Sequence, residues 1–174
     1  MGTFSPSFDE YLASKQRDLQ RRLASCKFDQ LGDRTTVARF VSDASLQLVE
    51  LREPAPSPTV LEKPDGIDVS VKWPGSAGID QFQDFNMEPG SQHHIYANAN
   101  EFYASKKFPK DVSTEAVREW VLAQRQTLAS WVKRFNEAAE VHNARQQALA
   151  ETIVSERQAV GTRAAEIARD LEGL

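Results

Sequence analysis

The fold of this chain is decided by residues 113–172, which read STEAVREWVLAQRQTLASWVKRFNEAAEVHNARQQALAETIVSERQAVGTRAAEIARDLE. The stretch contains no proline and a single glycine, Gly161, so it carries no strong helix-breaking signal. At about 100° per residue, its main apolar side chains project within roughly 60° of one line. They are Val117, Trp120, Val121, Leu128, Trp131, Val132, Phe135, Ala139, Leu149, Ile153, Val160, Ala164, Ile167 and Leu171. A single long helix over 113–172 with one apolar stripe is therefore predicted.

The middle of this predicted helix carries fewer apolar side chains than its two ends. The positions concerned are Asn136, Ala139, His142, Asn143 and Gln146. A kink, a hinge or the corner of a helical hairpin is therefore expected at 136–146. A strict heptad pattern also fails, because the core positions that follow Ile153, Val160 and Ile167 by three residues are charged. A period near 3.6 predicts little left-handed supercoiling and suits packing in a globular helical layer or a short, coiled-coil-like bundle.

Two shorter helices are predicted before the middle of the chain. Ser5 and Pro6 form a strong start signal for a helix over 5–28, because serine caps the free amides and proline needs no donor at the first position. Cys26 falls on its apolar face and is expected to be a small buried residue. After a break at Gly32, apolar residues at helical spacing predict a second helix over 34–52, whose second half has extended structure as the alternative.

The centre of the chain changes from proline-rich to strand-like sequence. Residues 53–66 hold half of the prolines and are predicted to be a linker. Apolar and polar residues then alternate from Ile67 to Trp73, which predicts a half-buried strand. Two further apolar segments flank Asn98-Ala99-Asn100, a sequence typical of a tight hairpin turn. A small antiparallel sheet of about three strands is expected within 67–109.

These elements predict an α+β fold in one domain over residues 1–174, with the long helix as its spine. The sheet and both N-terminal helices are expected to pack on the first half of that helix, around Trp120, Trp131 and Phe135. The apolar residues of the second half then have no cover. A partner protein, or a second copy of the chain, is predicted to bind there. The candidate partner-binding residues are Leu149, Ile153, Val160, Ile167 and Leu171.

Composition argues against several other classes of partner. The net charge of −4 and the isoelectric point near 5.4 give no general attraction to a phosphate backbone, so nucleic acid is disfavoured as a ligand. The basic face of the first predicted helix, with Arg17, Arg21 and Arg22, keeps a nucleic-acid-binding adaptor open as an alternative. Neither a secretory leader nor about eighteen consecutive apolar residues are present, so a bacterial-type cytosolic protein without a membrane segment is expected.

No catalytic constellation is evident in the sequence. The single cysteine excludes an internal disulfide, and the adjacent His93 and His94 would point to opposite faces of a strand, so neither a metal nor another cofactor is expected. His142 is expected to be a partly buried structural residue. Acidic residues in the middle segment leave a small hydrolase or nuclease as an alternative. These are Asp80, Asp84, Glu88 and Glu101.

Several short motifs resemble a region of multidomain bacterial proteins. They are VSVKWPGSAG at 69–78, Gln81-Phe82, NEFYAS at 100–105, TEAV at 114–117, LASWV at 128–132 and RFNEA at 134–138. In those proteins a strand, a hairpin and a long helix precede an effector domain, such as a Toll/interleukin-receptor-type domain, with a proposed role in anti-phage defence. No effector domain follows here, and the N-terminal helices differ. The resemblance covers about residues 67–157 and implies a non-catalytic sensor or assembly module, without any catalytic residue.

The sequence therefore favours a non-enzymatic interaction or assembly module over both alternatives. The reasons are the uncovered apolar stripe after Leu149 and the missing nucleophile, base and metal-ligand patterns.

Overall fold

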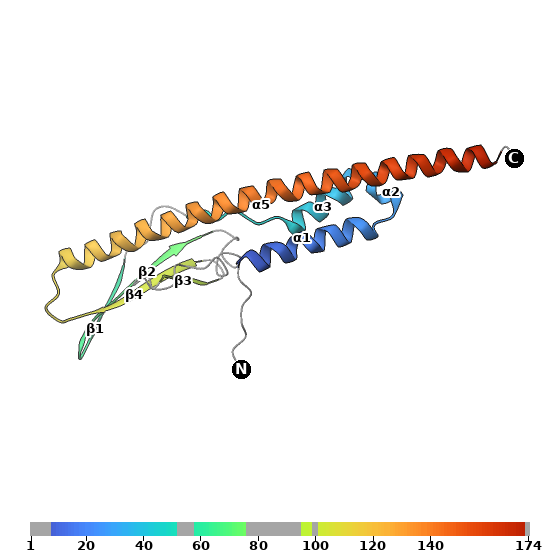
Figure 1. Ribbon diagram of the computed structural model, residues 1–174. Helices are drawn as coiled ribbons and strands as arrows, with labels where there is room; N and C mark the ends of the chain where they lie inside the picture. The colour runs from blue at the N-terminus through green and yellow to red at the C-terminus, as the bar shows by residue number, and fades with distance from the viewer. Residues whose placement is uncertain (1–7, 52–57, 76–94, 99–100, 173–174) are drawn as a thin grey trace. The chain divides into compact units, whose positions relative to one another are not determined.

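The computed structural model describes residues 8–51, 58–75, 95–98 and 101–172 (Figure 1). Three helices open the chain, four strands follow, and one long helix closes it, which confirms the α+β class. In order, they are α1 (Phe8–Ser25), α2 (Phe28–Leu31), α3 (Arg34–Ala44), β1 (Thr59–Lys63), β2 (Gly66–Pro74), β3 (Ile95–Asn98), β4 (Glu101–Phe108) and α5 (Thr114–Leu171). The start signal at Ser5-Pro6 lies outside the described residues.

The long helix α5 contributes to two compact units. Unit 1 comprises Met1–Phe8 and Gln47–Ala139, and unit 2 comprises Asp9–Leu46 and Glu140–Leu174. The helix is continuous over its 58 residues, so the expected corner of a hairpin at 136–146 is wrong. The single domain over 1–174 stays a prediction. None of the described helices is both long enough and apolar enough to cross a membrane.

Unit 1 is a four-stranded antiparallel sheet packed against the first part of α5. The strand order is β1-β2-β4-β3, and Val71 of β2 lies opposite Ala104 of β4. Alternate residues of β2 and β4 are buried on the face toward α5, as the period of two predicts. Phe108 meets Trp120 edge to face, with ring centroids 5.7 Å apart. The role of the first half of the helix in the core is thus confirmed.

The sheet contains one strand more than the sequence indicated. Residues 59–63 were predicted as part of the linker, but they form β1 and pair with β2 from Thr59↔Ser70 to Lys63↔Gly66. Prolines stand only at its two flanks, Pro58 and Pro64, where they remove no bond of the β1–β2 ladder. Every residue of β1 is exposed, so the strand lacks the one-sided burial that makes a strand recognisable from its sequence.

The second predicted helix is shorter than expected. It ends at Ala44, and the helix over 45–52 is wrong for the described residues, which are extended. Asparagines of α5 bind this extended segment through both polar atoms of their side chains. In unit 2, Asn143 accepts from the Leu46 amide at 2.7 Å and donates to the Leu46 carbonyl at 2.9 Å. In unit 1, Asn136 makes the same pair of bonds with Val49, both at 2.9 Å.

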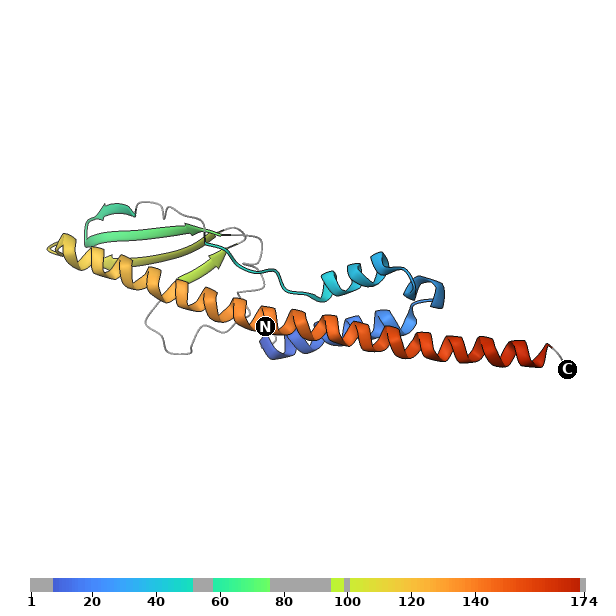
Figure 2. The ribbon, with the colours of Figure 1, turned by 90° about the horizontal axis from the view of Figure 1, so that it is seen from above.

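Unit 2 packs the N-terminal helices along the second part of α5, as Figures 1 and 2 show. The expected packing of these helices on the first half of α5 is therefore wrong. Their core is a cluster to which α1, α3 and α5 all contribute. Its buried members are Leu19, Leu23, Cys26, Leu31, Val41, Ala44 and Ala150, with Leu149, Ile153 and Val154 among the partly buried residues packed against it. The buried position predicted for Cys26 is confirmed.

Candidate functional site

The five residues predicted to bind a partner fall into two groups on α5. Leu149 and Ile153 are partly buried because they pack against the cluster of unit 2. Val160, Ile167 and Leu171 are 70%, 45% and 61% exposed, respectively. The chain therefore covers the first two itself, and only the last three remain candidates for a free contact surface.

The two groups belong to one continuous face of α5. Positions spaced alternately by four and three residues lie on one side of a helix. We call the first four of them the covered seam: Gln146, Ala150, Ile153 and Arg157. We call the next four the bare stripe: Val160, Ala164, Ile167 and Leu171, all exposed. Figures 1 and 2 show the corresponding end of α5 running on past α1, α2 and α3.

Arg157 marks the end of the covered seam. Its Nη1 donates to the carbonyl oxygens of Leu23 at 2.6 Å and of Cys26 at 2.7 Å. These carbonyls lie at the C-terminal end of α1, where the helix has no further amides to offer them. Arg157, a partly buried charged residue, thus supplies the hydrogen bonds that these carbonyl oxygens at the end of α1 lack.

Phe28 of α2 is the last side chain laid on α5. Its ring rests against Gly161 so closely that a methyl group at that position would overlap the ring atoms. A side chain at position 161 would therefore displace the Phe28 ring, which gives a reason for a residue unfavourable in helices to stand inside α5. Phe28 itself is 51% exposed, so the ring lies against α5 at Gly161 without being buried there.

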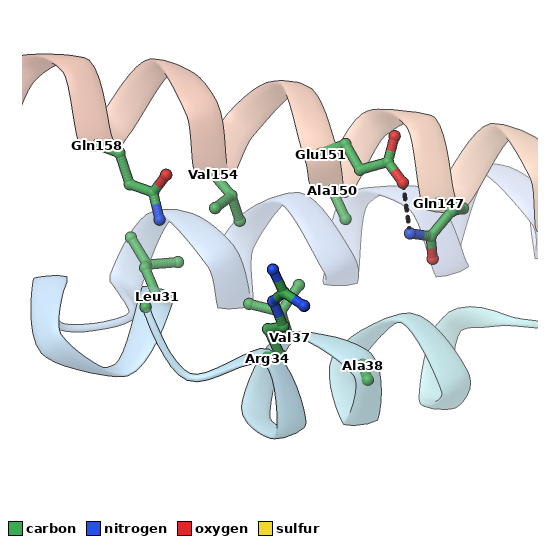
Figure 3. Close-up of a pocket in the computed structure, with 10 residues that line it drawn as sticks. Leu31, Arg34, Val37, Ala38, Gln147, Ala150, Glu151, Val154 and Gln158 are labelled. Carbon is green, nitrogen blue, oxygen red and sulfur yellow. Dashed lines mark hydrogen bonds between the residues drawn. The ribbon is translucent and has the colours of Figure 1, made fainter.

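A groove of about 590 Å³ lies between α3 and α5 within unit 2 (Figure 3). Its lining includes the apolar residues Leu31, Val37, Ala150 and Val154. Charged residues stand on both sides, Arg34 on α3 and Glu151 on α5. Figure 3 shows Arg34 extending from α3 toward the space between the helices, and Glu151 accepting a bond from Gln147 at 2.7 Å.

His142 is buried in unit 2, and the predicted structural role fits its contacts. Its Nε2 donates to the Ala44 carbonyl at 3.1 Å, and Gln146 Nε2 lies 3.5 Å from its Nδ1. Burial, together with the charges of Lys15 and Arg145, lowers the pKa of His142 below its usual 6.5, against the opposite effect of the Ala44 carbonyl. The neutral ring is therefore the form that this site holds.

The acidic residues of the hydrolase alternative are not brought together in the described part of the chain. Asp80, Asp84 and Glu88, like His93 and His94, lie outside the described residues. Glu101 is on the sheet and pairs with Lys72 at 2.7 Å. Within the described ranges, no group of three or more histidine, cysteine or acidic residues is placed to hold a metal ion. The hydrolase alternative and the absence of cofactors stay predictions.

Two of the three arginines predicted on the basic face of α1, Arg21 and Arg22, form ion pairs within the chain, whereas Arg17 forms none with the residues that the structure describes. Arg22 pairs with Asp18 at 2.7 Å and with Asp43 at 2.8 Å, and Arg21 also pairs with Asp18. Lys15 donates to the Asp43 carbonyl at 2.8 Å. The bonds to Asp43 connect α1 to α3, and the ion pairs reduce the positive charge that α1 could present to a phosphate backbone. The nucleic-acid alternative stays a prediction with weaker support than its sequence alone indicated.

Sequence reasoning missed the roles of Arg157 and Phe28. Arg157 interrupts an apolar stripe, and Gly161 interrupts a helix, so both were visible as irregularities. Their partners on α1 and α2 were not, because contacts between residues more than 130 positions apart depend on how the helices pack.

Comparison of the chain with protein-family models, with curated proteins and with solved structures finds no match. The resemblance to the effector-linked bacterial region therefore stays a prediction.

Proposed function

We propose that this chain is a non-enzymatic protein–protein interaction module that assembles through the C-terminal part of α5, with a second copy of the chain as its first partner. The observation that carries the proposal is the bare stripe. Val160, Ile167 and Leu171 are large apolar residues, exposed on one face of a helix, and they continue a seam that is buried elsewhere in the same helix. A helix with an uncovered apolar face gains stability when a partner covers it.

The spacing of the bare stripe suits helix–helix packing. Its four residues alternate at intervals of four and three, the spacing at which side chains of one helix insert between those of another. The stripe extends over roughly 16 Å at 1.5 Å per residue. An interface of this length is small, so the expected assembly depends on protein concentration.

The covered seam shows what occupies the same face where a partner is present. There, Ala150 is fully buried and Ile153 packs against the helices of unit 2. The bare stripe repeats this chemistry with Ala164 and Ile167 at the equivalent positions. Helical packing of the same kind is therefore the simplest way to cover it.

Sedimentation velocity over a wide range of concentration tests the proposal. Wild type is expected to associate, and Ile167→Asp is expected to weaken the association at least about tenfold, because a carboxylate would be buried without a partner. Thr162→Asp is the matched control: it adds the same charge on the opposite side of the same exposed segment, where Thr162 bonds only to Gln158. Ile153→Asp is less informative, since Ile153 also supports the core of unit 2.

A wild-type chain that stays monomeric at every concentration, and is unchanged by Ile167→Asp, would contradict self-association. The proposed module acts in the cytosol, and its role as an accessory or sensor component of a bacterial defence-type system is the biological setting that the motif resemblance supports.

A further inference from the structure

The groove between α3 and α5 is lined by apolar and charged residues of these two helices. Its α5 wall runs from Gln147 to Gln158, and its lining combines apolar residues with Arg34 on α3 and Glu151 on α5. An apolar channel between two helices, bordered by charges, is the usual receptor for an amphipathic helix. A helix placed there would add a fifth member to the helices of unit 2.

The bare stripe matches this groove in length. From Val160 to Leu171 it covers as many residues as the groove wall from Gln147 to Gln158, which is roughly 16 Å in each case. The largest side chains of the stripe are aliphatic, as are the larger apolar side chains of the groove, Leu31, Val37 and Val154. One chain thus carries both an uncovered amphipathic helix and an unfilled groove of equal length.

One charged residue beside the groove, Arg34, and one beside the stripe, Asp170, have opposite signs. Arg163 and Asp170 lie on the same side of the bare stripe, at roughly 70° and 90° from its centre line. Arg34 and Asp170 form no ion pair with any other residue that the structure describes. Each is therefore available to a partner, and the two have opposite charge.

We propose that the groove formed by Leu31, Arg34, Val37, Ala150, Glu151 and Val154 receives the bare stripe of a second copy of this chain. The inference rests on the proposed function and names the surface that the stripe contacts. The groove wall and the bare stripe point to directions roughly 120–140° apart around the same continuous helix. The contact is therefore head to tail: the stripe of each copy fills the groove of the next, in a ring or an open chain.

Charge reversal tests the pairing of groove and stripe. Arg34→Glu is expected to raise the dissociation constant of the full-length protein about tenfold or more, because it faces Asp170 of the second copy with a like charge. Adding Asp170→Arg to the same chain is expected to restore the constant to within about threefold of wild type. Arg39→Glu is the matched control, since Arg39 is exposed on the same helix and does not line the groove.

Mixing two inactive variants gives an independent test. A groove variant, Arg34→Glu with Ala38→Glu, and a stripe variant, Ile167→Asp, are each expected to be monomeric by sedimentation velocity. Mixed together they are expected to form a heterodimer, because the intact stripe of the first still fits the intact groove of the second. Circular dichroism of each variant establishes that loss of association is not loss of folding.

Two results would overturn the inference. If the groove variant associates like wild type while the stripe variant is monomeric, the stripes pair with each other; the groove proposal then fails and the proposed function stands. If wild type itself is monomeric, both fail.

Discussion

The covered seam and the bare stripe are successive segments of one helix with similar sequence patterns and opposite surroundings. In the covered seam, Gln146 and Ala150 are almost completely buried. In the bare stripe, all four residues are exposed. The difference is not intrinsic to the helix, since both segments place apolar residues at the same spacing. It arises because α1, α2 and α3 cover α5 only as far as Gly161, where Phe28 packs.

This comparison shows what an apolar stripe alone can and cannot indicate. A stripe predicts that some surface covers it, and it carries no information on whether that surface belongs to the same chain. The covered seam includes two polar members: Arg157, which donates to the carbonyl oxygens of Leu23 and Cys26, and Gln146, whose Nε2 lies 3.5 Å from His142 Nδ1. The bare stripe contains only apolar residues, so it suits a less specific contact that forms and breaks. Substitutions that separate folding from association can therefore sharpen the distinction.

The largest expected difference is between core and stripe truncations. Leu23→Ala removes a fully buried side chain from the cluster of unit 2 and is expected to lower the free energy of unfolding by about 3 kcal/mol. Ile167→Ala, on the bare stripe, is expected to change it by less than about 0.5 kcal/mol at concentrations where the chain is monomeric. Urea unfolding of both variants measures this, and equal losses would contradict the distinction between the two segments.

A smaller effect is expected from the arginine that ends the covered seam. Arg157→Met keeps the apolar stem and leaves the carbonyls of Leu23 and Cys26 without their donor, so a loss of about 1–2 kcal/mol is expected. Arg163→Met is the matched control on the bare segment, where the exposed pair with Glu166 contributes about 0–1 kcal/mol. Comparison of the two unfolding midpoints decides whether Arg157 supports α1. A loss no greater than that of Arg163→Met would show that it does not.

A double-mutant cycle tests whether Gly161 exists to accommodate Phe28. Alanine at Gly161 favours a helix by about 1 kcal/mol, but its methyl group would overlap the Phe28 ring. In the wild-type background, Gly161→Ala is therefore expected to give no net gain. In the Phe28→Ala background it is expected to stabilise by about 0.5–1 kcal/mol in thermal or urea unfolding. The same gain in both backgrounds would mean that the ring moves aside without cost.

Much of the fold could be predicted from the sequence because its signals are local. The long helix was predicted at 113–172 and observed at Thr114–Leu171, since hydrophobic periodicity and the absence of proline act over a few residues. The strands β2, β3 and β4 were predicted on similar grounds. The exposed strand β1 was missed because it has no buried face to impose a period of two.

What could not be predicted depends on contacts between distant residues. The end of α3 at Ala44 follows from contacts in which Asn136 and Asn143 bind an extended segment 87 and 97 residues away. The sequence showed these asparagines only as a thin part of the apolar stripe. Likewise, the apolar face of α1 is compatible with either half of α5, because all the helices share one period. The bare stripe was predicted within a longer candidate surface, and only the packing of α1–α3 showed which residues remain exposed.

The smallest expected effect concerns pH and the buried histidine beside the covered seam. The pKa of His142 is lowered in the folded chain, chiefly by burial, so above its usual value of 6.5 the ring is neutral in both states and has no effect on stability. As pH falls through about 6.5, the unfolded chain takes up the proton first, and unfolding becomes easier.

The lowered pKa values of the exposed Asp33 and Asp65 affect stability only near and below pH 3.8, which is a separate range. Urea unfolding at about pH 5 and about pH 8 is therefore expected to show a decrease in stability at the lower pH that His142→Gln reduces. An equal decrease in the variant would assign the effect to other groups, and association through the bare stripe is expected to be unaffected by either change.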